Sequence, residues 1–547
     1  MTQLNKLQIK AEILTVLSNL QTNFDDAKIE ELLATLIEQK DKKSIREVLI
    51  KELLKANEKR AVLICFLLLK LCGGKEAEDA LWDVLKTPAI PDVTKAIILN
   101  LLKDMGTKIN YEELEEYLED PNEVIDADTK KLLHAAIINP EAQIDFLDFV
   151  NSLPDADAKL LVQSLGEDYS SNELANILNP LVLYNPTSKL GHMAIDILGN
   201  TKSQLALHTL LETLDFVNEE DTSALIKKNI SKLKISGVRE DNSTEFYKNI
   251  LSSKPYEAYA SYPDGHGNQA IIFSREKEDE IIQLVAVVVN DTWGIMDCFG
   301  FNEISQTEFQ RIVDKFYRGD EHIRIDIHVA KDILLNAEKL TRKTNGKTPY
   351  EYICWRSLLA DVEAEQVPIE LTLRSRIDKK SLSDKDLGKI YKLDFIQRWF
   401  FDTSYNDEFK MLINNLNGRI EDKFSIDFES IVEESFDEIF SSSQKDLLDK
   451  RILMSAYLKF LSGDKEMTEL LYSLYSDEDK KNRLAKNIIR KSIYEYYVSL
   501  KFKYKQEHKM TNIFVMKNRP KTEELTIKQI ESIIGAIEKL WVKRSEA

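Results

Sequence analysis

The 547-residue sequence has few cysteines, glycines and prolines, and each shortage limits what the protein can be. None of the four cysteines belongs to a CxxC pair or has a histidine at metal-ligand spacing, so we expect free buried thiols and no metal centre. The 17 glycines and 12 prolines form no low-complexity tract, which indicates a chain that is mostly folded helix. The cysteines are Cys65, Cys72, Cys298 and Cys354.

The sequence also lacks the common catalytic signatures. It contains no GxSxG elbow and no HExxH pair. The segment Thr344–Thr348 resembles the end of a phosphate-binding loop, but position 341, where the first glycine should fall, is threonine. We therefore expect no nucleotide or other cofactor, and the sequence favours a binding protein over an enzyme.

Long hydrophobic runs are missing as well. The longest apolar stretch, residues 61–72, has 12 residues and is interrupted by Lys70, so it is too short to cross a bilayer. The N-terminus enters helical periodicity directly and lacks the basic, apolar and small-residue regions of a secretory signal. These features predict a cytoplasmic protein without a membrane partner.

The charge is negative overall and unevenly distributed. The net charge is −19, which argues against nucleic acid wrapped around the whole surface, because phosphate binding needs a dense positive face. From Lys480 to the C-terminus, however, 17 Lys and Arg stand against 7 Asp and Glu. One end of the chain is therefore basic and the remainder strongly acidic.

A repeated pattern covers the first 237 residues: an amphipathic helix that ends on an apolar turn and a glycine or asparagine. Successive copies of this pattern end 27 to 38 residues apart, which is the spacing of stacked helix pairs. Such a stack buries its core between neighbouring pairs and leaves a long surface for binding. The copies of the pattern end at Gly74, Gly106, Asn139, Gly166, Gly199 and Gly237.

Within this region, AIDILGN at 194–200, followed by SQLALHTLLETL at 203–214, is similar to the helix-turn-helix junction of HEAT-type repeats. The resemblance to HEAT-like, or armadillo-type, proteins covers residues 1–237. It implies a right-handed α-solenoid whose inner helices line a concave groove.

Near Lys254 the periodicity changes to that of strands. Two alternating segments flank the turn at 264–267, and the β-branched run 281–289 is the strongest predicted strand. Ser305 and Glu308 form a capping box that opens a helix. We expect a small α+β module with an antiparallel sheet at about 250–345. The remainder, 346–547, is predicted to be an irregular helical region with a basic end, or else further degenerate solenoid; residues 371–380 look like a connector.

The alternating segment 322–328 is the first candidate for chemistry. Read as a strand, it places His322, Arg324, Asp326 and His328 on one face. Two imidazoles and a carboxylate at this spacing could bind zinc or act as acid and base. The alternative is a solvated strand face in which Arg324 pairs with Asp326.

The turn at 264–267 is the second candidate. Asp264 and His266 could converge with Asp291 or Asp297 from the following strands, which makes this loop our first choice for a ligand contact in the module. Asp and Gly also favour turns for backbone reasons alone, so the alternative is a purely structural turn.

The basic end is the third candidate. Its cations could bind a polyanion, with interleaved tyrosines stacking on the bases of a single strand. In the alternative interpretation the aromatic residues are core and the basic surface binds the acidic remainder of the protein or a partner. The candidate polyanion-binding residues are Arg483, Lys486, Arg490, Lys491, Lys501, Lys503 and Lys505.

Taken together, the patterns favour a protein–protein interaction or scaffolding protein that binds another protein in the solenoid groove and uses the central sheet as a second recognition surface. Two hypotheses of other classes remain open. One is an enzyme or ligand-binding site in the central module, possibly dependent on a metal. The other is nucleic-acid binding through the basic end.

Overall fold

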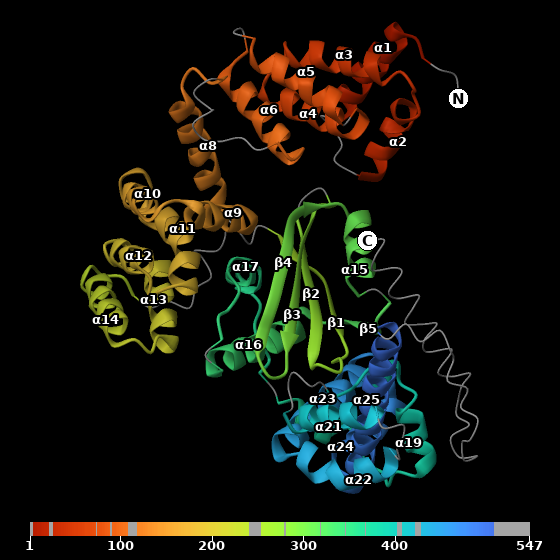
Figure 1. Ribbon diagram of the computed structural model, residues 1–547. Coiled ribbons are helices and arrows are strands. Elements are labelled where there is room, and N and C mark those ends of the chain that lie inside the picture. Colours follow the sequence, from red (N-terminus) through yellow and green to blue (C-terminus); the bar gives the residue numbers. More distant parts are fainter. Residues whose placement is uncertain are drawn as a thin grey trace.

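A computed structural model describes residues 4–507 apart from short gaps, which are residues 21–25, 73, 88–89, 108–116, 240–252, 278–279, 318, 345, 367, 402–406 and 422–427. The described protein is mainly helical, with an N-terminal helix array, a five-stranded antiparallel sheet and C-terminal helices (Figure 1). This confirms the predicted fold class. No helix among the described residues is long and apolar enough to cross a membrane.

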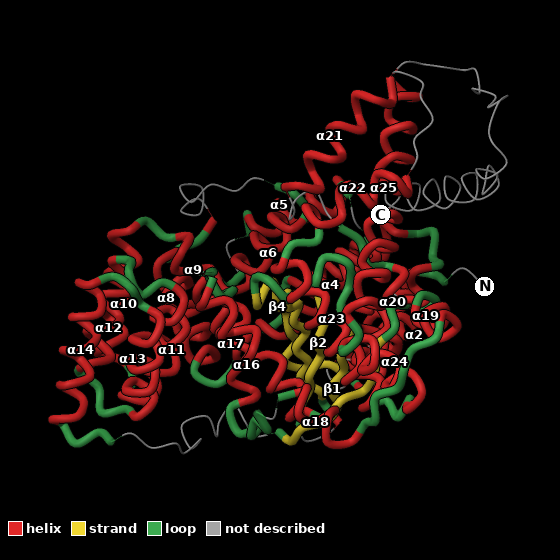
Figure 2. The backbone as a smooth tube through the Cα atoms, turned by 90° about the horizontal axis from the view of Figure 1, so that it is seen from below, coloured by secondary structure: helices red, strands yellow, loops and turns green. Residues whose placement is uncertain are grey.

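Helices two apart along the N-terminal array contact one another, so the array has two rows. In its first half α1, α3 and α5 form one row and α4, α6 and α8 the other; in its second half the rows are α9, α11, α13 and α10, α12, α14. Figure 2 shows α10, α12 and α14 on the outer margin, with α11 and α13 nearer the sheet. The helices are α1 (Lys6–Leu20), α2 (Asp26–Ile37), α3 (Lys42–Leu53), α4 (Glu58–Leu71), α5 (Lys75–Leu85), α6 (Asp92–Asp104), α8 (Pro121–Ala136), α9 (Pro140–Ser152), α10 (Asp155–Asp168), α11 (Ser171–Tyr184), α12 (Lys189–Gly199), α13 (Gln204–Phe216) and α14 (Glu220–Ile235).

The residues that end the repeated sequence pattern have different structural roles. Gly106 and Gly237 have positive φ angles and close helix C-termini, because the following amide donates back to the last turn in each case. Asn139 caps α9 through its side chain, with proline at the first helical position. Gly166 and Gly199 lie within helices; at Gly199 a Cβ would stand 2.6 Å from the Cβ of Asn229, so this glycine serves the close packing of α12 on α14.

The central sheet has the strand order β4-β3-β2-β1-β5, and every described neighbour is antiparallel. One face packs on α16 and α17 through a core that includes Phe273, Val285 and Val287. The opposite face packs on α15 through Ile272 and Leu284. The elements are β1 (Lys254–Ser261), β2 (Asn268–Glu276), β3 (Ile282–Asn290), β4 (Gly294–Ile304), α15 (Gln306–Tyr317), β5 (His322–Ile325), α16 (Ile327–Lys343) and α17 (Tyr350–Trp355).

Two local predictions were wrong. The strand expected at 322–328 stops at Ile325, because the carboxylate of Asp326 accepts the amide of His328 at 2.9 Å and starts α16. The expected connector at 371–380 forms helix in its first part, since Pro368 precedes α18 (Ile369–Arg376).

The C-terminal helices share their core with the sheet. A single cluster of buried residues runs from the sheet face through Trp355 and Trp399 to Ile493. The domain limits drawn from the sequence stay predictions. The remaining elements are the short helix η4 (Arg356–Leu359), α19 (Asp384–Ile390), α20 (Asp394–Gln397), α21 (Asp407–Glu421), α22 (Phe428–Ile439), α23 (Ser442–Leu461), α24 (Lys465–Tyr475) and α25 (Glu478–Glu507).

Helix α17 joins the second half of the array to the sheet. It contacts α9, α11 and β4, and Cys354 lies within the array core. Tyr350 donates its hydroxyl to Asp148 of α9 at 2.6 Å and packs edge-on against Tyr184 of α11. Helix α17 therefore covers the row of the array that α9 and α11 form.

The four cysteines are free, as predicted, and burial raises the pKa of each thiol. The pKa of Cys65 reaches about 12, and Cys298 and Cys354 are fully buried or nearly so. Because the thiolate is the reactive form, we expect the native protein at pH 8 to react rapidly with at most one equivalent of a disulfide reagent, at half-buried Cys72, and the unfolded protein with four. Two or more fast thiols in the native protein would contradict the packing described.

Candidate functional site

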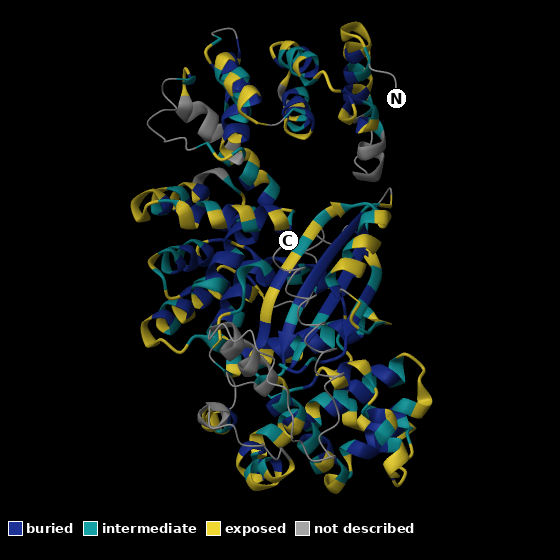
Figure 3. Ribbon diagram, turned by 45° about the vertical axis from the view of Figure 1, so that its right-hand side comes forward, coloured by how far each residue is buried: buried dark blue, intermediate teal, exposed yellow. Residues whose placement is uncertain are grey.

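Strand β4 carries large apolar side chains that face solvent. Trp293, in the turn before the strand, and Met296, Phe299 and Phe301 are 44, 45, 38 and 37% exposed. Figure 3 shows this edge strand with long exposed stretches beside the buried strands of the same sheet. A cluster of such residues on one element is the kind of patch that marks an interaction surface, whereas single exposed apolar residues are normal.

The exposure follows from the local backbone. The pairing of β4 with β3 shifts register between Val288 and Val289, and this bulge leaves both Met296 and Asp297 exposed. Beyond the bulge the strand alternates. Gly300 lies against the indole of Trp355, where a Cβ would come within 2.4 Å of the ring, and the neighbouring phenylalanines face the other way.

Helix α15 extends this aromatic group. Phe316 packs edge-on against Phe299 with ring centroids 5.4 Å apart, and Phe299 contacts Phe301 at 6.0 Å. The buried side of α15, including Phe309 and Val313, covers the inner strands. We call Met296, Phe299, Phe301 and Phe316 the β4 aromatic surface.

The backbone edge of β4 is occupied by side chains. The amide of Asn302 donates to Glu141 of α9 at 3.3 Å, and the amide of Ile295 donates to Thr341 of α16 at 2.8 Å. The amide of Cys298 donates to the side chain of Asp297 at 2.9 Å. These contacts protect the edge from pairing with another strand. Asp297 places an exposed carboxylate on the same strand, whereas the carboxylate of Glu303 is paired with Lys277 at 3.2 Å.

The turn at 264–267 is held by its own aspartate. One carboxylate oxygen of Asp264 accepts the amides of His266 and Asn268, both at 2.8 Å. Asp264 therefore has the structural role that was the alternative for this turn. His266 lines a cavity and packs edge-on against Phe400 with centroids 4.5 Å apart.

Asp291 lies beside the backbone of this turn: its amide donates to the carbonyl of Gly267 at 3.0 Å. The Asp264 carboxylate is used within the turn itself, so the suggested meeting of the Asp264 and His266 side chains with Asp291 stays a prediction. A Cβ on Gly267 would overlap the Asp291 carboxylate, which is bound by Arg451 of α23 through Nε at 2.5 Å and Nη2 at 3.3 Å. Arg451 also donates to the carbonyl of Gly265 at 3.1 Å. Asp297 does not join this group, because it lies on the exposed bulge of β4. No local pattern pointed to Arg451, which is 160 residues from Asp291 along the chain.

The other polar candidates do not gather. His322 stacks on Tyr317 at 4.1 Å, where burial lowers its pKa. The ring of His328 donates to the carbonyl of Glu363 at 2.6 Å, and this bond raises the pKa of His328. Arg324 pairs with Glu257 of β1 at 2.9 Å, whereas the sequence suggested Asp326 as its partner. In the described part of the chain, no three His, Cys, Asp or Glu side chains are arranged to hold a metal ion.

The described cations of the basic end face carboxylates of the protein itself. Lys491 lies 3.8 Å from Glu495 of its own helix, and Tyr496 packs against Phe409, so part of the aromatic series is core. The side chains of Lys501, Lys503 and Lys505 are outside the described residues. These contacts favour the alternative in which the basic stretch binds the acidic remainder. Three more of the candidate polyanion-binding residues form the pairs Arg483–Asp384 at 2.7 Å, Lys486–Glu433 at 2.6 Å and Arg490–Glu429 at 2.5 Å.

No protein-family model matches this sequence, and no curated protein or solved structure was found to be similar to it. The likeness of the array to HEAT-type repeats therefore rests on its sequence pattern and on its two rows of helices.

Proposed function

We propose that the protein is a protein–protein interaction or scaffolding protein and that the β4 aromatic surface is one of its contact sites. The observation that carries this proposal is the cluster of Met296, Phe299 and Phe301, each more than a third exposed, on a sheet that otherwise buries its apolar side chains. Aromatic and methionine side chains are enriched where proteins bind one another. Their exposure costs hydrophobic free energy that a partner would recover.

The geometry of the edge limits the form of the partner. Strand addition needs free amides along β4, and those of Ile295, Cys298 and Asn302 already donate to side chains. The partner is therefore an amphipathic helix that lays its apolar side chains across the face of the strand. Basic residues beside its apolar stripe would meet the exposed carboxylate of Asp297.

We further infer that the helix array is a HEAT-like right-handed solenoid that gives the protein a second contact surface. Val62 and Leu69 of α4 are 51 and 39% exposed, and with half-buried Phe66 they follow one face of that helix at spacings of four and three residues. The row of α9 and α11 is covered by α17, so the free apolar face lies in the first half of the array. Two separate contact surfaces suit a scaffold in the cytoplasm.

A photo-crosslinking experiment tests the proposal. A benzophenone amino acid placed at Phe299 in the full-length protein should capture a partner peptide with an apolar stripe and basic flanks. The same group at Leu371, which is 55% exposed on α18, serves as the control. Identical capture at both positions would show that the β4 aromatic surface does not bind such a peptide in preference to other exposed surfaces.

A binding measurement with the captured peptide then shows how much the β4 aromatic surface contributes to affinity. Phe299→Asp should weaken its affinity at least tenfold, because it puts a charge in the centre of the apolar contact, and Leu371→Asp should leave it unchanged. Equal affinity of the Phe299→Asp variant and the wild type would refute the proposal. Capture of a peptide from a second copy of this chain would identify the surface as a self-association site.

A further inference from the structure

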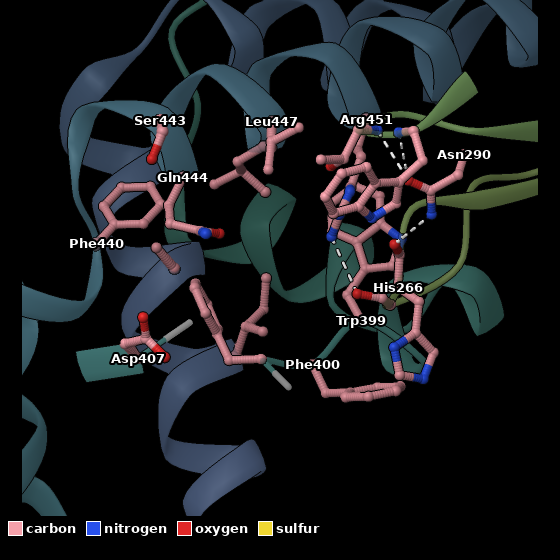
Figure 4. A pocket seen from close by; sticks show the side chains of 17 residues that line it. His266, Asn290, Trp399, Phe400, Asp407, Phe440, Ser443, Gln444, Leu447 and Arg451 are labelled. Carbon is pink, nitrogen blue, oxygen red and sulfur yellow. Dashed lines mark hydrogen bonds between the residues drawn. The ribbon is translucent and has the colours of Figure 1, made fainter. Parts of the chain in front are cut away.

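A cavity of about 390 Å³ lies at the end of the sheet where the β1–β2 and β3–β4 turns meet. Its lining comes from the β1–β2 and β3–β4 turns, from residues 399–401, from Phe440 and from helices α21, α23 and α25. Figure 4 shows the lining side chains around an open space between Gln444 and Trp399. This volume is in the range of pockets that bind small organic molecules.

Aromatic side chains form much of the wall. Trp399 is buried and fixed in orientation, because its indole N–H donates to the carbonyl of Pro263 at 2.8 Å. Phe400 and Phe440 add further rings, and Leu447 adds aliphatic surface on α23. A wall of pre-oriented rings accommodates a flat apolar molecule better than a bulky one.

The arginine at the cavity is neutralised before any ligand binds. The guanidinium of Arg451 is held by both carboxylate oxygens of Asp291 and by the carbonyl of Gly265. Asp407 contributes a carboxylate at the opposite side of the cavity. An anionic ligand would therefore meet a neutralised arginine and a repelling carboxylate, so the site disfavours anions.

Gln444 supplies a polar contact that can select among neutral ligands. Its amide points from α23 into the open space (Figure 4). An amide offers one acceptor and one donor side by side, which match a lactam or a similar edge of a heteroaromatic ring. We propose that this cavity binds an uncharged planar heteroaromatic molecule, whose ring packs between Trp399 and the phenylalanines and whose lactam-type edge pairs with Gln444.

Three matched probes test this proposal by ligand-detected NMR on the full-length protein. Quinolin-2-one is neutral and carries the lactam edge, naphthalene lacks that edge, and quinoline-2-carboxylate is anionic. We expect saturable binding of quinolin-2-one, at least tenfold tighter than that of quinoline-2-carboxylate. Absence of saturable quinolin-2-one binding, or equal binding of the anion, would overturn the proposal.

Two variants locate the binding. Leu447→Trp fills the cavity and should weaken quinolin-2-one at least tenfold, whereas Leu371→Trp on exposed α18 should have no effect. Gln444→Leu should weaken quinolin-2-one several-fold and leave naphthalene unchanged, and it keeps the test informative if the tryptophan variant does not fold. Unchanged quinolin-2-one binding in Gln444→Leu, or in folded Leu447→Trp, would place the molecule elsewhere and refute the assignment.

Discussion

Replacing Arg275 with methionine should lower the free energy of unfolding by about 3 kcal/mol, the lower end of the range for breaking a buried ion pair, because Arg275 is buried but its partner Asp361 is 36% exposed. Arg275 lies on β2 and is 1% exposed. It donates to Asp361 through both terminal nitrogens at 2.8 and 3.0 Å, to the carbonyl of Leu358 at 2.9 Å and to that of Ser253 through Nε at 3.1 Å. Methionine fills much of the space but leaves these acceptors without their donor.

Urea unfolding followed by tryptophan fluorescence would measure this effect, with hydrogen exchange of β2 as a local readout. Arg311→Met is the matched control, because Arg311 is exposed on α15 and pairs only with Glu308 one turn away among the described residues. That variant should leave the unfolding midpoint nearly unchanged. A loss below about 1 kcal/mol in the Arg275 variant would mean that its bonds are replaced by water.

Local signals in the sequence predicted much of the fold. The helix start at Ser305, the turn that follows Asp264 and the β-branched strand after Ile281 depend on neighbouring residues, so the pattern specified them. The failure at 322–328 is also local in origin. Alternating isoleucines favoured a strand, but the capping bond of Asp326 gives the backbone a helical start.

The candidate sites were less predictable because they depend on contacts between distant parts of the chain. Arg451 and Trp399 reach the turn at 264–267 from more than 130 residues away, and neither has a local signature. The exposure of Phe299 depends on a bulge in β4 and on Gly300 fitting against Trp355. A sequence pattern can place phenylalanines on one strand face but cannot tell which face a helix will cover.

The junction between the array and the sheet should weaken in acid through a single carboxylate. Glu212 of α13 accepts from Arg342 of α16 at 2.6 Å and from Arg356 of η4 at 2.9 Å. Burial opposes ionisation of this carboxyl, but the two guanidinium charges outweigh it and lower the pKa of Glu212 to about 2. Glu338 also accepts from Arg356, at 3.2 Å, so the arginine joins carboxylates from both parts of the protein.

The direction of the pH effect follows from the lowered pKa. The unfolded carboxyl titrates near 4.5, so the stabilisation is complete above that pH and is lost as the pH falls toward 2. The difference between the two pKa values corresponds to about 3 kcal/mol. Glu212→Gln should remove about that much at pH 7, and its stability should then fall less than that of the wild type between pH 4.5 and 2.

Hydrogen exchange of α13 and α17 as a function of pH would measure the junction directly, because their protection depends on the contact between the two parts. Glu47→Gln is the control, since Glu47 forms an exposed pair with Lys6 within the array and lies far along the chain from the junction. It should leave the exchange of α13 and α17 unchanged at every pH. Superimposable pH profiles for the wild type and the Glu212 variant would show that the helices and the sheet are held together by their apolar contacts alone, with α17 and Cys354 as the main attachment.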